Sequence, residues 1–337
     1  MYPDFLGIGA QKAGTTWLAR NLQVHPQIYM PRKEIHYFDR KINDRSNALT
    51  RLRGKRDVDK QWRGQVRNWI VRYGIQRPSL RKLVWAFKYY MRSYNDEWYL
   101  SVFDQKDGKV AGEITPAYSV LDKERVARVH RVVPEAKVIF FMRSPIERVW
   151  SHAVMSFDKV EKGSASSASE EQLFEKLGRG STLRLTNYLR TFENWGSFYP
   201  EDQIFVGFLE DIHFFPEELL RRLYGFLGVD PHFHKSLTNK KVHSRSEATM
   251  PTGIAVHLAR NFHEEISRLS ERFGGYASFW LFCAERLIED SPEDDSIPYP
   301  LYESKMWEEW RSGSGDPSAT RAAQIQSGPL ASLQVAR

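Results

Sequence analysis

The residues best suited to chemistry lie near the N-terminus, where residues 5–20 read FLGIGAQKAGTTWLAR. An apolar run leads into a Gly-rich turn and then into a helix start, and the amides of such a turn bind phosphate together with the helix dipole. The spacing from Gly9 to Gly14 is that of a Walker A loop, but Thr15 stands where that loop has its lysine. The lysine lies inside the turn instead, as Lys12. The sequence therefore predicts a phosphate loop for a nucleotide with a leaving group other than that of ATP.

A second candidate anion site follows the apolar run KVIFFM, in residues 143–152, RSPIERVWSH. Pro145 fits the first turn of a helix, where its missing N–H is not needed. Arg143 offers a planar guanidinium and Ser151 a hydroxyl, which together suit a phosphate monoester. The alternative interpretation is a helix cap with a surface arginine. Two such sites in one sheet favour a nucleotide with phosphates at two separate positions.

The elements that must position these residues alternate along the chain. Buried strands are predicted at Phe5–Gly9, Lys137–Met142 and Gln203–Leu209, and helices at Thr15–His25, Pro145–Phe157, Leu183–Phe198 and Glu217–Leu227. This order predicts an α/β fold: a P-loop-like, doubly wound sheet of central parallel strands flanked by helices, with ligands at the carboxyl ends of the strands. We expect a single domain over 1–310 with an insertion, and a disordered Ser/Gly/Ala/Gln-rich tail over 311–337.

Composition narrows the class of protein. The 337 residues carry a formal charge of +7, which suits an anionic ligand or a membrane surface. Zinc-ligand spacing, HExxH and RNP signatures are lacking, so neither a metal nor nucleic acid is expected. No apolar stretch of about 18 residues is present, and the first strand begins too early for a signal peptide. With the single cysteine Cys283, which we expect in the core, this predicts a cytoplasmic protein.

Residues 41–93 differ from the rest of the chain. They hold 15 Lys or Arg, only 3 Asp or Glu, and several Trp and Tyr residues. One interpretation is a basic, aromatic-rich helical insertion that grips an anionic acceptor or makes peripheral contact with a membrane. The other is a solvated helical insertion whose aromatic side chains pack on the core.

At these motifs the sequence resembles the sulfotransferases that use 3′-phosphoadenosine 5′-phosphosulfate (PAPS) and release the bisphosphate (PAP). The resemblance is closest to the bacterial and glycan-modifying branch and runs from about residue 3 to about residue 250. It is carried by GAQKAGTTWL, RSPIERVWSH, KEIHYFD (33–39), GEITPAY (112–118) and YGFLGV (224–229).

The resemblance implies roles for both anion sites. The 5′-phosphosulfate would be held by the loop, namely by Gln11, Lys12, Ala13, Gly14, Thr15, Thr16 and Trp17. Lys12 would stabilise charge on the departing bisphosphate, so no metal is needed. Arg143 and Ser151 would hold the 3′-phosphate, and Lys240 and Lys241 would close over it from a later loop; the alternative for these two lysines is a solvated basic loop.

The resemblance also implies a general base in KEIHYFD. Glu34 aligns with the carboxylate that takes the acceptor's proton, and His36 is its rival. A glutamate of ordinary pKa is a weak base, so burial or charge developing on the sulfuryl group must make it more effective. If residues 34–38 are extended, both side chains point to one face. The alternative for Glu34 is a structural carboxylate, either at the start of a helix or in a salt bridge such as one with Lys33.

GEITPAY departs from the glycan-type pattern, because Ile114 stands where a lysine is frequent. Glu113, Thr115 and Tyr118 remain as candidate acceptor contacts or supporting residues, and the alternative is a plain turn after a strand. We expect sulfuryl transfer from PAPS to a hydroxyl, or an amine, of a small-molecule, lipid or glycan acceptor. The alternatives are a P-loop small-molecule kinase and a non-catalytic protein that binds nucleotide and polyanion.

Overall fold

The computed structural model describes residues 2–40, 48–160, 183–233, 248–313 and 315–317. Its centre is a sheet of five parallel strands in the order β2-β3-β1-β4-β5. The strands are β1 (Phe5–Gly9), β2 (Ile28–Tyr29), β3 (Val110–Ile114), β4 (Lys137–Met142) and β5 (Ile204–Phe208). Since β1 pairs with both β3 and β4, the phosphate loop leaves the middle of the sheet. The α/β fold with a parallel sheet flanked by helices is confirmed.

The three strands predicted from apolar runs are present, with β5 one residue shorter at each end. β2 and β3 are additional. β2 has only two residues, and β3 reads VAGEI, in which a glycine and a buried glutamate interrupt the apolar run. A short or polar strand carries too little hydrophobic signal to be recognised from its own residues.

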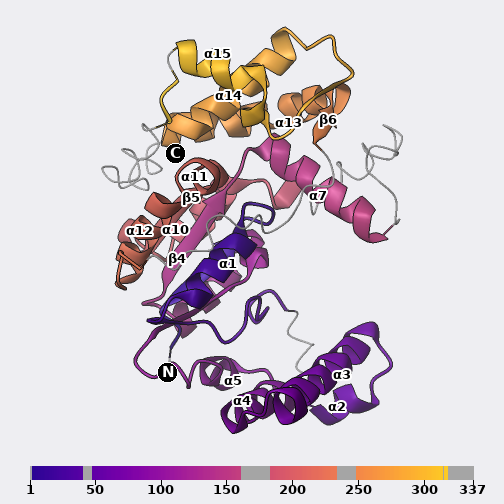
Figure 1. The fold of residues 1–337 in the computed structure, drawn as a ribbon, viewed down its shortest axis with the longest axis vertical. Helices are drawn as coiled ribbons and strands as arrows, with labels where there is room; N and C mark the ends of the chain where they lie inside the picture. Colours follow the sequence, from indigo (N-terminus) through magenta and orange to yellow (C-terminus); the bar gives the residue numbers. More distant parts are fainter. Residues whose placement is uncertain (1, 41–47, 161–182, 234–247, 314, 318–337) are drawn as a thin grey trace.

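Helices cover both faces of the sheet and extend beyond its two ends (Figure 1). The N-terminal part contains α1 (Thr15–Val24), α2 (Ala48–Arg53), α3 (Asp57–Ile70), the π-helix η2 (Val71–Gln76), α4 (Leu80–Met91), α5 (Asp96–Ser101), the 3₁₀ turn η3 (Pro116–Val120) and α6 (Lys123–Val132). Then follow α7 (Pro145–Val160), α10 (Tyr188–Gly196), η5 (Glu201–Gln203), α11 (Leu209–Phe214) and α12 (Pro216–Leu227). The C-terminal part has β6 (Thr249–Pro251), α13 (Thr252–Phe273), α14 (Gly275–Glu289), β7 (Ser296–Pro298), η6 (Leu301–Glu303) and α15 (Lys305–Gly313).

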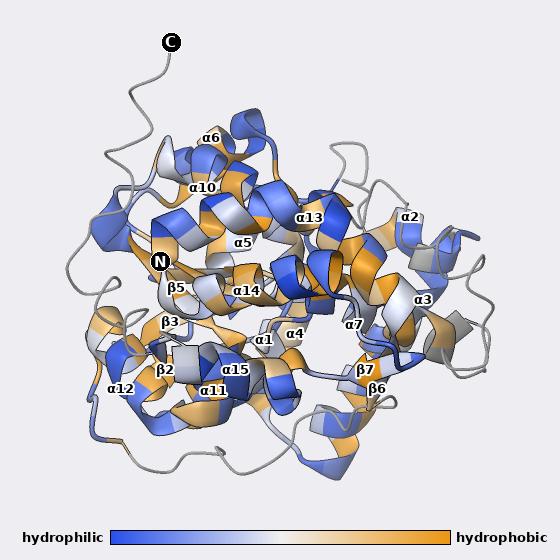
Figure 2. Ribbon diagram, turned by 90° about the horizontal axis from the view of Figure 1, so that it is seen from above, coloured by the Kyte–Doolittle hydropathy of each residue, from blue (hydrophilic) through white to orange (hydrophobic). Residues whose placement is uncertain are grey.

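Two helical groups lie at opposite ends of the long axis. Helices α2–α5 lie at one end and α13–α15 at the other, with the sheet between them (Figure 1). α14 is mostly hydrophobic in Figure 2, and Cys283 on it is fully buried, as expected for a core cysteine. Among the helices of the described ranges, none combines the length and the apolar character needed to cross a bilayer.

The C-terminal helix α15 extends to Gly313, into the segment predicted as a tail. Its Trp307 and Trp310 are buried against Phe279 of α14, with ring centroids 4.9 and 5.4 Å apart. Residues 318–337, most of that predicted tail, lie outside the described residues.

Candidate active site

The phosphate loop joins β1 to α1 in a conformation that needs glycine. Gly14 has φ +83° and stands directly before the first turn of α1. A side chain there would be strained, and its Cβ would lie 2.3 Å from Cδ1 of Ile212 on α11. Lys12, at the tip of the loop, also has a positive φ of +73°. The loop therefore turns sharply and directs the N-terminus of a ten-residue helix at its concave side.

The predicted loop residues divide by exposure. The side chains of Ala13, Thr15 and Trp17 are buried in the protein, and their backbone amides remain candidates for binding phosphate. The side chains that reach the surface, in part, are Gln11, Lys12 and Thr16. These three, with the loop amides, are the groups that a bound phosphate would meet.

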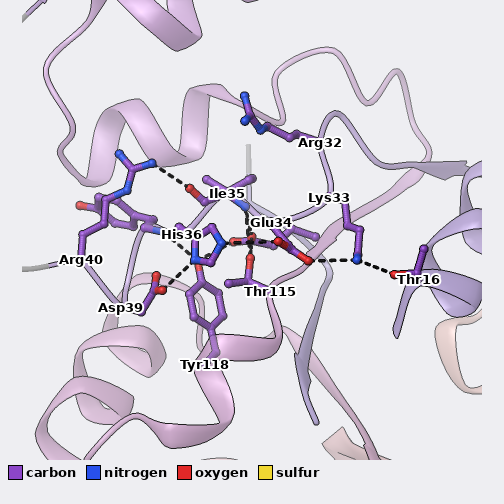
Figure 3. A network of polar contacts seen from close by, with 12 residues as sticks. Thr16, Arg32, Lys33, Glu34, Ile35, His36, Asp39, Arg40, Thr115 and Tyr118 are labelled. Carbon is purple, nitrogen blue, oxygen red and sulfur yellow. Dashed lines mark hydrogen bonds and ion pairs between the residues drawn. The ribbon is translucent and has the colours of Figure 1, made fainter. Parts of the chain in front are cut away.

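Lys33 connects the phosphate loop to the predicted base (Figure 3). Its Nζ donates to Oγ1 of Thr16 at 2.9 Å and lies 2.9 Å from Oε1 of Glu34. The ion pair with Glu34 was anticipated from the sequence, but the bridge to Thr16 was not. Through this one ammonium group, the start of α1 and the carboxylate of Glu34 are brought within a few ångströms of each other.

Glu34 and His36 adopt backbone conformations that residues other than glycine rarely take. Their φ angles are +51° and +56°, so the expectation of an extended segment is wrong. The two side chains still face each other, with Nε2 of His36 3.6 Å from Oε2 of Glu34, while Nδ1 of His36 lies 2.7 Å from Oδ2 of Asp39. A row of alternating charge, Lys33–Glu34–His36–Asp39, results (Figure 3).

Positive φ angles concentrate on the predicted catalytic residues. Among the described residues, four that are not glycine have such angles: Lys12, Glu34, His36 and Asp107. A left-handed conformation is unfavourable for these side chains, and strain of this kind clusters where function requires it. This coincidence supports a functional role for the first three.

The charged groups of the row shift the pKa values of Glu34 and His36. Hydrogen bonding to His36, and then to Lys33, lowers the pKa of Glu34 to about 2 although burial opposes this. Hydrogen bonding to Asp39 and Glu34 raises the pKa of His36 to about 9. Near neutral pH Glu34 is therefore ionised and His36 is protonated. The expectation that burial makes Glu34 a stronger base is wrong for this state of the protein.

A buried glutamate, Glu113, holds the backbone of the segment that carries the row. Oε2 of Glu113 accepts the backbone N–H of Ile35 at 3.0 Å and the hydroxyl of Thr115 at 2.5 Å, while Oε1 accepts the hydroxyls of Tyr99 at 2.9 Å and Tyr118 at 3.0 Å. The Tyr118 oxygen in turn accepts the N–H of Tyr37 at 2.9 Å. Glu113, Thr115 and Tyr118 are fully buried, so they do not contact an acceptor and act instead by positioning residues 35–37.

We expect Glu113→Ala to lower the free energy of unfolding by about 3 kcal/mol, because it leaves the buried hydroxyls of Tyr99 and Tyr118 without their acceptor and removes one of the two acceptors of the Ile35 N–H. Chemical denaturation followed by tryptophan fluorescence measures this loss. Glu124→Ala, on the exposed first turn of α6, is the matched control. A loss no larger than that of the control would show that the Glu113 network does not stabilise the fold.

Arg143, the arginine of the second predicted anion site, contacts the phosphate loop, which is the first predicted anion site. Nη1 of Arg143 approaches the backbone oxygen of Lys12 at 3.4 Å, Nε pairs with Oε2 of Glu147 at 3.0 Å, and Nη2 donates to the hydroxyl of Tyr299 at 2.7 Å. Arg143 is only 6 % exposed, so the alternative of a surface arginine is wrong. Ser151 is half-buried on α7, two turns further on.

Some predicted residues cannot be placed, and others were missed. Lys240 and Lys241 lie outside the described residues. Tyr299 was not anticipated, because it meets Arg143 from a segment 156 residues away. Lys33 stands inside the motif that revealed Glu34, and its spacing from Thr16 gave no sign of their contact.

A model of the sulfotransferase family matches residues 3–234. The chain belongs to the sulfotransferase family. The resemblance drawn from the motifs is thereby confirmed.

Two relatives of this sulfotransferase modify carbohydrates according to their names. Heparan sulfate glucosamine 3-O-sulfotransferase 6 of Mus musculus is 24% identical over 248 residues, which cover 70% of this chain and 57% of that protein. Carbohydrate sulfotransferase 15 of Mus musculus is 24% identical over 258 residues, 68% of this chain and 44% of that protein. The sulfotransferase chain thus spans about half the length of these relatives.

A solved sulfotransferase structure has the same fold. The crystal structure of a sulfotransferase from Alicyclobacillus acidocaldarius superimposes with a TM-score of 0.53 at 21% identity, covering 80% of this chain and 95% of that one. The P-loop-like sheet of this sulfotransferase is therefore the fold of its family.

Proposed function

We propose that this sulfotransferase moves a sulfuryl group from PAPS to the hydroxyl of an acceptor, with Glu34 as general base and Lys12 at the leaving group. The observation that carries the proposal is the Lys33 bridge, in which one ammonium lies 2.9 Å from both Thr16 Oγ1 and Glu34 Oε1. A sulfuryl group held by the phosphate loop would lie next to the carboxylate that activates the acceptor.

The transfer conserves atoms and charge. The acceptor oxygen attacks sulfur as the bond from sulfur to the 5′-phosphate oxygen breaks, and Glu34 takes the hydroxyl proton. PAP departs with the negative charge that forms on the bridging oxygen, near Lys12. A cation placed where charge develops lowers the barrier most. Lys33 lies where it can contact the group in transit.

Glu34 has to change its surroundings before it accepts a proton. Its contacts with Lys33 and His36 hold the pKa at about 2 in the free protein, and its side chain is 41% exposed. A bound acceptor would shield it from water, and a sulfuryl group would draw Lys33 away. Both changes raise the basicity of Glu34 when the acceptor is in position.

The carbohydrates in the names of the two relatives favour a sugar hydroxyl as acceptor, whereas Ile114 replaces a lysine that is frequent in glycan-modifying enzymes. We therefore propose a glycan, lipid or small-molecule hydroxyl. The test is formation of PAP from PAPS on a panel of such acceptors without added metal. Formation on none of them, or only the consumption of ATP, would refute the function. A cytoplasmic location is part of the proposal and rests on the composition alone.

We expect Arg143→Ala to weaken PAP binding by about 10- to 150-fold. This factor corresponds to the loss of one hydrogen bond to a charged group, which contributes about 1.5–3 kcal/mol. ADP, which lacks the 3′-phosphate, should lose little. Calorimetric titration with both ligands checks this, and a melting curve confirms that the variant remains folded despite the loss of the Glu147 ion pair. Equal losses for PAP and ADP would remove Arg143 from the 3′-phosphate site.

The pH dependence of kcat/KM separates the two candidate bases. Glu34, with its pKa lowered to about 2, is already ionised at pH 5, so catalysis by Glu34 gives a flat profile between pH 5 and 8. His36 is protonated up to about pH 9, so catalysis by neutral His36 gives a tenfold rise per pH unit over that range. We expect the flat profile. A continuous rise would assign the base to His36.

A further inference from the structure

The helices inserted before α5 expose hydrophobic side chains to an unusual degree. Among the described residues, eleven large hydrophobic side chains are exposed, and eight of them lie between positions 49 and 87. They are Leu49, Leu52, Ile70, Val71, Ile75, Leu80, Val84 and Phe87. Scattered hydrophobic residues on a surface are ordinary, but a concentration on one part of the chain marks an interaction site.

The helix α4 is apolar on two opposite faces. Trp85, Tyr89 and Tyr90 are buried in the aromatic core of the insertion, where Trp85 and Tyr89 stack with centroids 4.9 Å apart. Leu80 and Phe87, which are 78% and 67% exposed, lie on the other face with Val84 between them. The spacing of 80, 84 and 87 places these three on one stripe. The first face explains the fold of the insertion, and the second remains uncovered.

The π-helix η2, which connects α3 to α4, continues this apolar surface. A Cβ at Gly74 would lie 4.0 Å from both Ile70 of α3 and Leu83 of α4, so the two helices adjoin there. Ile75, the next residue of η2, is 73% exposed. The exposed side chains thus come from adjoining elements at the end of the molecule where α2–α5 lie (Figure 1).

Positive charge gathers on the same helices. Residues 48–92 contain 13 Lys or Arg against 2 Asp or Glu, which leaves 36 basic and 40 acidic residues for the rest of the chain. Exposed members of the basic set include Arg53, Lys55, Arg67, Arg72, Arg77 and Lys82. The charge of the whole protein therefore arises from this insertion. Two copies would repel each other across this surface, whereas an anionic surface attracts it.

We propose that α2, α3, η2 and α4 form a docking surface for an anionic lipid bilayer, with the stripe of Leu80, Val84 and Phe87 entering the headgroup region. Basic residues around an apolar helix face bind such membranes by combining charge attraction with burial of the apolar side chains. An acidic polysaccharide would use the charge but would leave the exposed leucine and phenylalanine side chains in water. The two features together favour lipid.

The docking surface adjoins the candidate active site. Arg32, two residues before Glu34, donates to the hydroxyl of Tyr90 on α4 at 2.9 Å and to Oε1 of Gln65 on α3 at 3.2 Å. If the proposed function holds, a bound membrane would bring acceptor hydroxyls near Glu34. The vesicle measurement below does not depend on that activity.

Co-sedimentation of the full chain with vesicles of phosphatidylcholine, with and without 30 mol% phosphatidylglycerol, tests the proposal. We expect binding to the anionic vesicles, weakened by salt, and at least tenfold weaker binding for the Leu80→Ser, Val84→Ser, Phe87→Ser triple variant. Tyr2→Ser with Leu183→Ser, which removes exposed hydrophobic side chains elsewhere, is the matched control and should bind like the wild type.

Several outcomes would overturn the docking surface. These are no binding to anionic vesicles at low salt, equal binding of the triple variant, or binding of dextran sulfate without binding of vesicles. PAP binding by calorimetry shows whether the triple variant has kept its fold. If the wild-type protein does not bind PAP, that result counts against the proposed function and not against the docking surface.

Discussion

Glu34→Gln should lower kcat by about 10²- to 10⁴-fold, the usual contribution of a general base. The amide keeps the shape of the side chain and can still accept a hydrogen bond from Lys33 or His36, but it cannot take the acceptor's proton. PAP binding should stay within about twofold of the wild type, because loss of a base affects the transition state and not the bound nucleotide. The measurement is steady-state formation of PAP with an acceptor that supports turnover.

Two companion variants sharpen this result. Glu34→Asp keeps a carboxylate on a shorter stem and should recover part of the rate, whereas Glu124→Gln, on an exposed helix turn, should change nothing. A Glu34→Gln protein with near-wild-type turnover and intact PAP binding would remove Glu34 as the base. His36 would then be the candidate, and the pH profile would rise toward its pKa of about 9.

Lys12→Met should lower kcat by about 10²- to 10³-fold, the range found when one donor to a developing charge is removed. The reason is the position of Lys12 in the phosphate loop, where its backbone is left-handed. In the proposed function this position places its ammonium group beside the departing bisphosphate. We expect the affinity for PAP to fall much less than kcat, because the lysine is needed most when the bridging oxygen acquires its charge.

Single-turnover kinetics and PAP titration together measure both effects of Lys12→Met. The control is Lys109→Met, a change of the same kind at an exposed lysine beside β3. If Lys12→Met loses PAP affinity and turnover in equal proportion, Lys12 serves binding and not the leaving group. Turnover close to that of the wild type would exclude it from the reaction.

Much of the fold followed from the apolar runs, because β1 and β4 are buried on both faces, β5 is buried in part, and all three are nearly continuous hydrophobic segments. The phosphate loop was predictable for a similar reason: a glycine at a required left-handed position and a helix start are local features. β3 was hidden because Glu113, a charged residue by type, lies in the core.

The site was less predictable, because its geometry depends on contacts distant in the chain. Glu113 meets Ile35 across 78 residues, and Arg143 meets Tyr299 across 156. The positive φ angles of Glu34 and His36 occur in a segment whose Ile35 and Tyr37 N–H groups bond to Glu113 and Tyr118, about 80 residues away in the chain, and the sequence next to them did not predict these angles. The family motif supplied the identity of Glu34, and only the structure supplied its link to Thr16 through Lys33.

Calorimetric titration with PAP and with ATP, in the absence of added metal, tests the central claim most directly. The proposed function predicts micromolar or tighter binding of PAP and much weaker binding of ATP, since the loop lacks a lysine at Thr15 and the second anion site requires a 3′-phosphate. Preference for ATP, appearing only with Mg²⁺, would contradict the account and would favour a kinase.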